Sequence, residues 1–186
     1  MTSGNAPGSP SGVAALLRQW HRAECWLAVL AFGFIAGILI LDVLGRELLG
    51  PIFRALQVKG PSGVYAAQKL SIYALVIGSF AGVGIATATS SHLLPRIGFK
   101  WVPAAFGPTM DRIADVFTGL FMLGVAWYGW VYASSSMQAG LRMQAFDAPI
   151  WPVQLAIPLG FLSAGLRYFF YAAWPTERPA LPEFQE

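Results

Sequence analysis

Four long runs of apolar residues alternate with short polar segments along this chain of 186 residues. No Asp, Glu, Lys or Arg interrupts these runs, which cover Cys25–Leu41, Leu70–Ser91, Val116–Leu141 and Ala148–Leu166. A hydrocarbon core about 30 Å thick is crossed by roughly 20 apolar residues in an α-helix. The pattern therefore predicts an all-α integral membrane protein with four transmembrane helices.

We expect the helices to cover about residues 23–47, 64–91, 110–138 and 149–173, inside a transmembrane domain of residues 20–175. Residues 1–19 begin with a stretch rich in Gly, Ser and Pro and predict a flexible N-terminal tail, and residues 176–186 predict a C-terminal tail. The first apolar run ends in Asp42 and Arg46 and not in a small-residue cleavage site, so we expect a retained helix rather than a signal peptide.

Two of the connections between these helices mix aromatic, aliphatic and basic residues. Residues 51–61 contain Phe53 and Lys59, and residues 95–108 contain Trp101 and Lys100. Aromatic rings and basic side chains both find partners in the headgroup layer. We therefore expect short interfacial segments between helices 1 and 2 and between helices 2 and 3, with ordinary loops as the alternative.

Composition and charge agree with a membrane protein. Charged residues make up 11% of the chain and apolar residues 56%, whereas a soluble domain has about 25% charged residues. The net charge of +3 comes from scattered Lys and Arg, which excludes a basic nucleic-acid surface. Seven of the twelve Lys and Arg residues would lie on the side of the two termini, so the positive-inside rule predicts cytoplasmic termini.

Small residues four positions apart occur in three of the predicted helices. Gly33 and Gly37 form such a pair in the first helix, and Gly78 and Gly82 form one in the second. Gly160 and Ala164 repeat the spacing in the fourth helix. Because small residues let helix backbones approach closely in lipid, we expect Gly33, Gly37, Gly78 and Gly82 to pack against another helix, in this chain or in a partner subunit.

The ionisable residues lie at the ends of the predicted spans. A transport path would place such residues in the middle of the membrane. Asp42 and Arg46 lie four residues apart and can pair across one helical turn as a structural anchor. Lys69 and Arg167 lie near the ends of the second and fourth helices, and we expect their long side chains to snorkel to the membrane surface.

The third and fourth helices carry two further features. Asp111 and Asp115 open the third helix, where the positive end of its dipole favours acids, and Arg112 can pair with Asp115. Pro158 predicts a bend in the fourth helix that leaves a backbone carbonyl without its usual partner.

Nothing in the sequence predicts catalysis, a metal site or a cofactor site. The sequence contains no phosphate-binding loop, metal-ligand cluster or nucleophile elbow. The histidines His21 and His92 could ligate a haem only at matching depth inside the bundle. Since one precedes the first helix and the other follows the second, we expect interfacial histidines and no enzyme activity.

Several motifs, in their order along the chain, resemble one family. The segment L-D-V-L-G-R at 41–46 is similar to that family's D-V-x-x-R, and Gly82 followed by His92 is similar to its exit from the second helix. A-P-I-W at 148–151 and A-I-P-L-G-F at 156–161, which include Trp151, Pro158 and Gly160, resemble the motif that opens its fourth helix. From about residue 20 to 174 the chain thus resembles the small membrane subunit (DctQ-like) of TRAP, or tripartite ATP-independent periplasmic, transporters.

The chain departs from that family's pattern at two places. Gln68 and Lys69 stand where the family often has an acid at the start of the second helix. Residues 93–95, Leu-Leu-Pro, follow His92 where an acid is common. Contacts that those acids make with partner subunits are therefore not expected here.

The resemblance implies a subunit of a secondary transporter in a bacterial inner membrane. It implies a large multi-helix membrane partner of the elevator type that holds the sodium and substrate sites, and a periplasmic binding protein that delivers an organic acid. This chain would then be a scaffold with no cofactor of its own. The alternatives are a membrane anchor of a redox complex and a self-contained small transporter or channel.

Overall fold

The computed structural model describes residues 12–57, 60, 63–89, 107–143 and 146–178. The elements are α1 (Gly12–Leu44), the π-helical turn η1 (Gly45–Leu49), α2 (Gly50–Ala55), α3 (Ala67–Ala88), α4 (Gly107–Gln138), α5 (Trp151–Gln154), α6 (Ala156–Ala173) and the 3₁₀ turn η4 (Pro175–Glu177). Four helical segments are long and apolar enough to cross a membrane: Gly12–Ala55, Ala67–Ala88, Thr109–Gln138 and Trp151–Ala173. The predicted four-helix membrane fold is confirmed.

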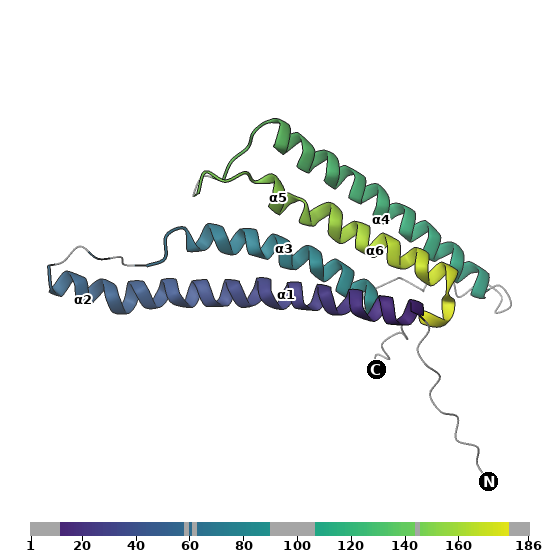
Figure 1. The fold of residues 1–186 in the computed structure, drawn as a ribbon, viewed down its shortest axis with the longest axis horizontal. Helices are drawn as coiled ribbons and strands as arrows, with labels where there is room; N and C mark the ends of the chain where they lie inside the picture. Colours follow the sequence, from purple (N-terminus) through teal and green to yellow (C-terminus); the bar gives the residue numbers. More distant parts are fainter. Residues whose placement is uncertain (1–11, 58–59, 61–62, 90–106, 144–145, 179–186) are drawn as a thin grey trace, which may run out of the picture.

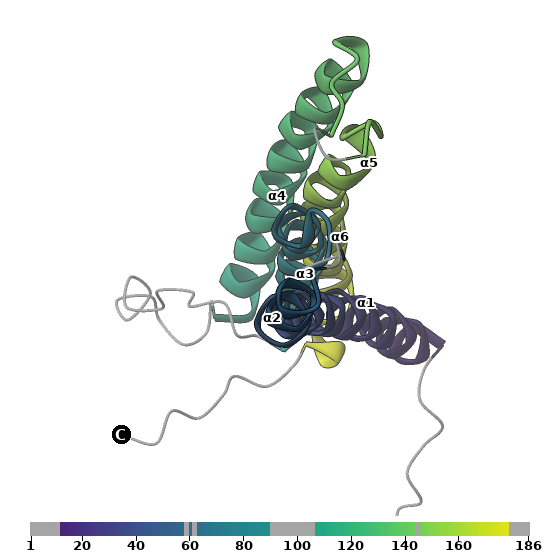
Figure 2. The same cartoon turned by 90° about the vertical axis from the view of Figure 1, so that its left-hand side faces the viewer.

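The helices form two antiparallel pairs that are not closed into a bundle. α3 packs along α1, and α6 packs along α4 (Figure 1). α3 and α6 make the main contact between the two pairs, and Figure 2 shows both of them between α1 and α4. The pairs converge where α1 begins and α6 ends, and they diverge toward α2 and α5 (Figure 1). We call these the convergent end and the divergent end.

The first span is longer than the sequence analysis expected. α1 begins at Gly12 and not near residue 23, so part of the expected tail of residues 1–19 is helical. Residues 13–19 consist mainly of Ala, Leu, Arg and Gln, which are strong helix formers. At the other end, η1 and α2 continue the helix to Ala55, a run of 44 residues that is about 66 Å long.

The expected interfacial segments are described only in part. Residues 51–55 belong to α2, which extends the axis of α1 rather than leaving it (Figure 1). Gly60 then lies so close to the Phe53 ring that a Cβ there would approach it within 2.6 Å. Most of the segment between α3 and α4 lies outside the described residues.

Glycines at two crossings let backbones touch inside the fold. A Cβ at Gly160 of α6 would collide with the backbone carbonyl oxygen of Phe80 in α3. Gly119 of α4 faces Gly165 of α6, and a Cβ at either would lie 3.2–3.3 Å from the carbonyl oxygen of the other. Such small-residue contacts drive helix association in lipid, where water exclusion adds little.

The fourth span is interrupted between α5 and α6, at Leu155. Pro158 has no N–H to donate to the carbonyl of Gln154, four residues earlier, as the sequence predicted. Its ring is buried against α4, where a Cβ at Gly129 would lie 3.3 Å from the Pro158 Cδ. The Gln154 side chain is also buried, and its amide donates to the Tyr132 hydroxyl at 3.1 Å.

Gly160→Ala should destabilise the protein, because the added methyl group meets the backbone of Phe80 and the two helices must separate. We expect a loss of about 1–3 kcal/mol in the free energy of unfolding, read from thermal unfolding in detergent by intrinsic tryptophan fluorescence. The matched control is Gly124→Ala on α4, where a Cβ meets nothing within 4 Å. Equal stability of the two variants would contradict the α3–α6 contact.

Candidate functional site

A buried ion pair joins three helices at the convergent end. Arg167 of α6 is 1% exposed. Its Nη2 donates to Oε2 of Glu24 in α1 at 2.7 Å, and its Nη1 donates to the carbonyl oxygen of Gly84 in α3 at 2.7 Å. Gly84 leaves room for this carboxylate, because a Cβ there would require Glu24 to move. One guanidinium thus ties α6 to both α1 and α3.

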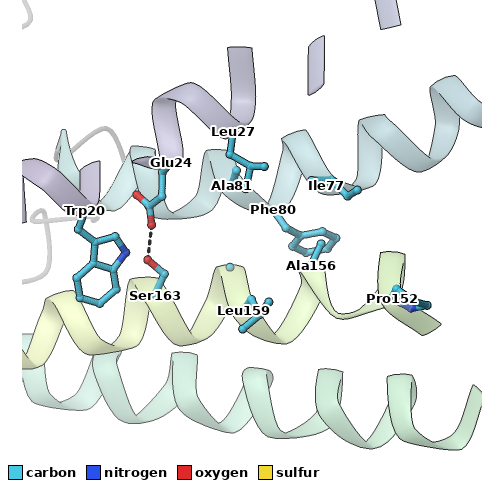
Figure 3. A pocket seen from close by; sticks show the side chains of 11 residues that line it. Trp20, Glu24, Leu27, Ile77, Phe80, Ala81, Pro152, Ala156, Leu159 and Ser163 are labelled. Carbon is cyan, nitrogen blue, oxygen red and sulfur yellow. Dashed lines mark hydrogen bonds between the residues drawn. The ribbon is translucent and has the colours of Figure 1, made fainter. Parts of the chain in front are cut away.

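Neighbouring side chains complete this cluster. The Ser163 hydroxyl, one turn before Arg167 on α6, donates to Oε1 of Glu24 (Figure 3). The Arg167 guanidinium carbon lies 5.3 Å from the centre of the Trp20 ring, a distance suited to a cation–π contact. The Nε of Arg167 has no hydrogen-bond partner within the described part of the chain. The cluster therefore satisfies both Glu24 oxygens and leaves the buried Nε–H of Arg167 unpaired.

The sequence pattern did not predict this pair. The first apolar run was counted from Cys25, so Glu24 was left outside it. Arg167 was expected to snorkel to the membrane surface, and that prediction is wrong, because the side chain turns inward to Glu24. A signal existed: in four spans of alternating direction, the start of the first and the end of the fourth lie at the same membrane surface, which brings an acid and a base to one depth. A buried charge needs such a partner.

A second ionic cluster lies at the same end. Arg178, just after η4, donates to Asp115 of α4 at 2.7 Å and lies 3.6 Å from Asp111. Asp115 is buried, and the sequence analysis had expected it to pair with Arg112. This cluster fixes the end of the fourth span to the start of the third. The Arg167 cluster joins the two helix pairs at this end, whereas the Arg178 cluster strengthens the α4–α6 pair.

At the divergent end, Asp42 anchors the chain segment before α3. Its side chain is 5% exposed, it pairs with Arg46 as predicted, and its Oδ1 accepts the N–H of Val64 at 3.0 Å. A Cβ at Gly63 would lie 2.7 Å from the same oxygen. The motif residues Asp42 and Arg46 therefore hold the connection between the first two spans.

The structure separates the four glycines that were grouped as helix-packing residues. Gly78 is buried against α1, where a Cβ would lie 3.2 Å from the Cβ of Ala31. Its contact is therefore inside the chain. By contrast, a Cβ at Gly33, Gly37 or Gly82 would meet nothing within 4 Å among the described residues. These three positions leave room for a neighbour outside the chain.

The remaining predicted motif residues fall at the start of the fourth span or outside the described residues. Trp151 opens α5 and is half-buried, whereas Pro158 and Gly160 are buried in α6. They shape the contacts of α6 with α4 and α3. His92 lies outside the described residues. The His21 ring lies 3.6 Å from the Cys25 sulfur within α1, and no group of three or more metal-ligating side chains occurs among the described residues.

Breaking the buried pair at either side should cost far more than breaking an exposed one. We expect Glu24→Leu and Arg167→Leu each to lower the free energy of unfolding by about 3–5 kcal/mol, because each leaves a buried charge unpaired. The double variant should recover much of that loss. Thermal unfolding of the four proteins in detergent gives the coupling energy of this double-mutant cycle.

The control cycle uses Arg142 and Asp147, an ion pair whose side chains are 61% and 81% exposed. The coupling energy of this exposed pair should be about 1 kcal/mol or less. If the Glu24–Arg167 cycle gave a coupling as small as this, the role assigned to the buried pair would be wrong.

Asp42→Ala should loosen the segment before α3, because the Val64 amide loses an ionised acceptor. Such a hydrogen bond contributes about 1.5–3 kcal/mol, so amide hydrogen exchange at Val64 should become roughly tenfold faster or more. Glu47→Ala, an exposed acid one turn further along, is the control and should leave that exchange rate unchanged. Unchanged exchange in both variants would refute the anchor.

The chain also matches known proteins. Residues 35–175 match the family described as tripartite ATP-independent periplasmic transporters, DctQ component. The chain is 24% identical over 165 residues to the ectoine TRAP transporter small permease protein TeaB of Halomonas elongata, which covers 89% of this chain and 80% of that protein. No solved structure matches it. The family match includes all the motif residues from Asp42 to Gly160, and the resemblance seen in the sequence is confirmed: the chain belongs to the DctQ family of TRAP transporter small membrane subunits.

Proposed function

We propose that this subunit is a static support for a large elevator-type membrane subunit during sodium-driven uptake of an organic acid. A periplasmic binding protein would deliver the acid to the membrane pair. The sodium and substrate sites would lie in the large subunit, and this chain would carry no cofactor and no catalytic step. We place it in a bacterial inner membrane with both termini cytoplasmic, the orientation favoured by its Lys and Arg distribution.

The observation that carries the proposal is how the buried charges of the spans are used. Glu24 and Arg167 are bound to each other and to Gly84 and Ser163 from three helices. A transported ion or acid would have to break these contacts, at the cost of exposing unpaired charges to hydrocarbon. The geometry therefore favours a fixed structural element over the alternative of a self-contained transporter or channel.

The open face of α1 supports a partner on that side. Gly33 and Gly37 share this face with Leu30, Phe34 and Leu41, which are 66%, 49% and 61% exposed and follow at spacings of three and four residues. An apolar face with two small residues suits close packing of another membrane helix. Because Gly78 packs inside the chain, we now assign the contact to Gly33 and Gly37 and no longer to the Gly78 pair.

The redox-anchor alternative has less support. Its haem would require two histidines at equal depth, and the imidazole of His21 instead contacts the Cys25 sulfur on its own helix. The absorbance of the purified protein separates the two proposals, since a bound haem gives an intense Soret band and a scaffold subunit gives none.

Gly33→Leu combined with Gly37→Leu should weaken assembly with the large subunit. Filling the open face should separate the helices and reduce recovery of the partner by roughly tenfold or more, a change of about 1.4 kcal/mol or greater. The measurement is co-purification of the large subunit through a tag on this chain, in a mild detergent. The control, Gly124→Leu, places the same side chain in open space on α4.

Solute uptake by cells that express all three components should fall together with assembly. Normal assembly and uptake in the double variant would refute the assigned face. Full uptake in cells that lack this chain would refute the scaffold function itself.

A further inference from the structure

Two pockets of different chemistry lie on either side of the Arg167 cluster. The first is an apolar groove of about 350 Å³ between α1, α3 and the α5–α6 span. Leu27, Ile77, Phe80, Ala156 and Leu159 line it, and Trp20, Glu24 and Ser163 lie at its convergent end (Figure 3). Gly160 also lines the groove, at the place where α6 approaches the backbone of α3.

The second pocket is more polar than the groove and lies closer to the ends of α3 and α6. It encloses about 290 Å³, and its lining includes Arg18 and His21 of α1, Arg167 and Tyr171 of α6, and Glu177 of η4. The guanidinium of Arg167 is bound to Glu24 through Nη2, yet its Nε has no partner among the described residues. Three basic side chains, one of them paired with Glu24, thus face one acid, Glu177, on this lining.

The shapes and charges of the two pockets select one kind of occupant. The Glu24 carboxylate at the end of the groove is already paired with Arg167, so an occupant of the groove meets mainly apolar side chains. A small anion would suit the polar pocket but leave the groove unfilled. An amphiphile with an anionic head and a flexible hydrocarbon chain matches both, and the bilayer around the chain supplies it.

We propose that one anionic phospholipid occupies both pockets. Its phosphate lies between Arg18, His21 and the Nε of Arg167, and one acyl chain follows the groove from Trp20 toward Pro152. The Trp20 ring lies at the junction of head and tail, the depth that tryptophan prefers in membrane proteins. The lipid would join the two helix pairs beside the α3–α6 contact, and this site does not depend on the transport function.

Native mass spectrometry of the full-length chain tests the headgroup. The protein is purified in mild detergent and mixed with phosphatidylglycerol or with phosphatidylcholine of the same acyl chains. We expect one tightly held phosphatidylglycerol and weaker retention of phosphatidylcholine. Arg18→Ala should weaken phosphatidylglycerol binding about fivefold, the usual effect of one basic residue near a membrane surface. Arg22→Ala is the control, an exposed base one turn away that lines neither pocket.

A second pair of variants tests the groove. Ala156→Phe fills it and should abolish retention of the lipid, whereas Val131→Phe, on the exposed face of α4, should not. A cooperative thermal unfolding transition without lipid is the control that both variants are folded. Equal retention of the two lipids, equal effects of Arg18→Ala and Arg22→Ala, or normal retention by Ala156→Phe would each overturn the proposal.

Two other occupants give distinct results. Stabilisation by inorganic phosphate alone, with no lipid retained, would assign the polar pocket to a small anion and overturn the proposal. Cross-linking of an Ala156→Cys variant that lacks Cys25 to a large partner subunit would assign the groove to a protein helix and would also overturn the proposal.

Discussion

The arrangement of the helices depends on one electrostatic constraint: a charge inside a membrane protein must find its partner within the protein. Arg167 meets this need with two acceptors on different helices, the Glu24 carboxylate and the Gly84 carbonyl. Hydrocarbon offers no competing water, so the geometry of these contacts fixes the relative rotation and depth of α1, α3 and α6. Buried ion pairs seldom add much net stability, but they do specify one arrangement.

Glycines make that arrangement sterically possible. At Gly84 the Glu24 carboxylate occupies the place of a side chain, and at Gly160 the backbone of α3 does so. The same residue type has a different use on the outer face of α1, where Gly33 and Gly37 remain uncovered in the isolated chain. Small residues thus serve internal packing on α3 and α6, and on α1 they leave space for a neighbour.

The sequence was a good guide to the spans and a poor guide to what joins them. Uninterrupted apolar runs predicted four helices, because chain length and hydropathy decide whether a helix can cross lipid. The motifs around Asp42 and Pro158 identified the family, and the Asp42–Arg46 pair is local enough to read from a spacing of four. Glu24 and Arg167 are separated by 143 positions, so their contact depends on how two distant helices pack. The sequence likewise cannot distinguish Gly33 from Gly78, because only the packed fold shows which face of each helix is covered.

The divergence of the two helix pairs has a mechanical consequence. Both ionic clusters lie at one end, whereas near the far end the two pairs meet through the edge-to-face contact of the Tyr65 and Phe146 rings and the approach of α3 to α5. Over about 30 Å of membrane thickness, a change of about 10° in the angle between the pairs would move the divergent end by about 5 Å. The Arg167 cluster limits this angle near one surface of the bilayer, and the ring contact of Tyr65 with Phe146 limits it toward the other.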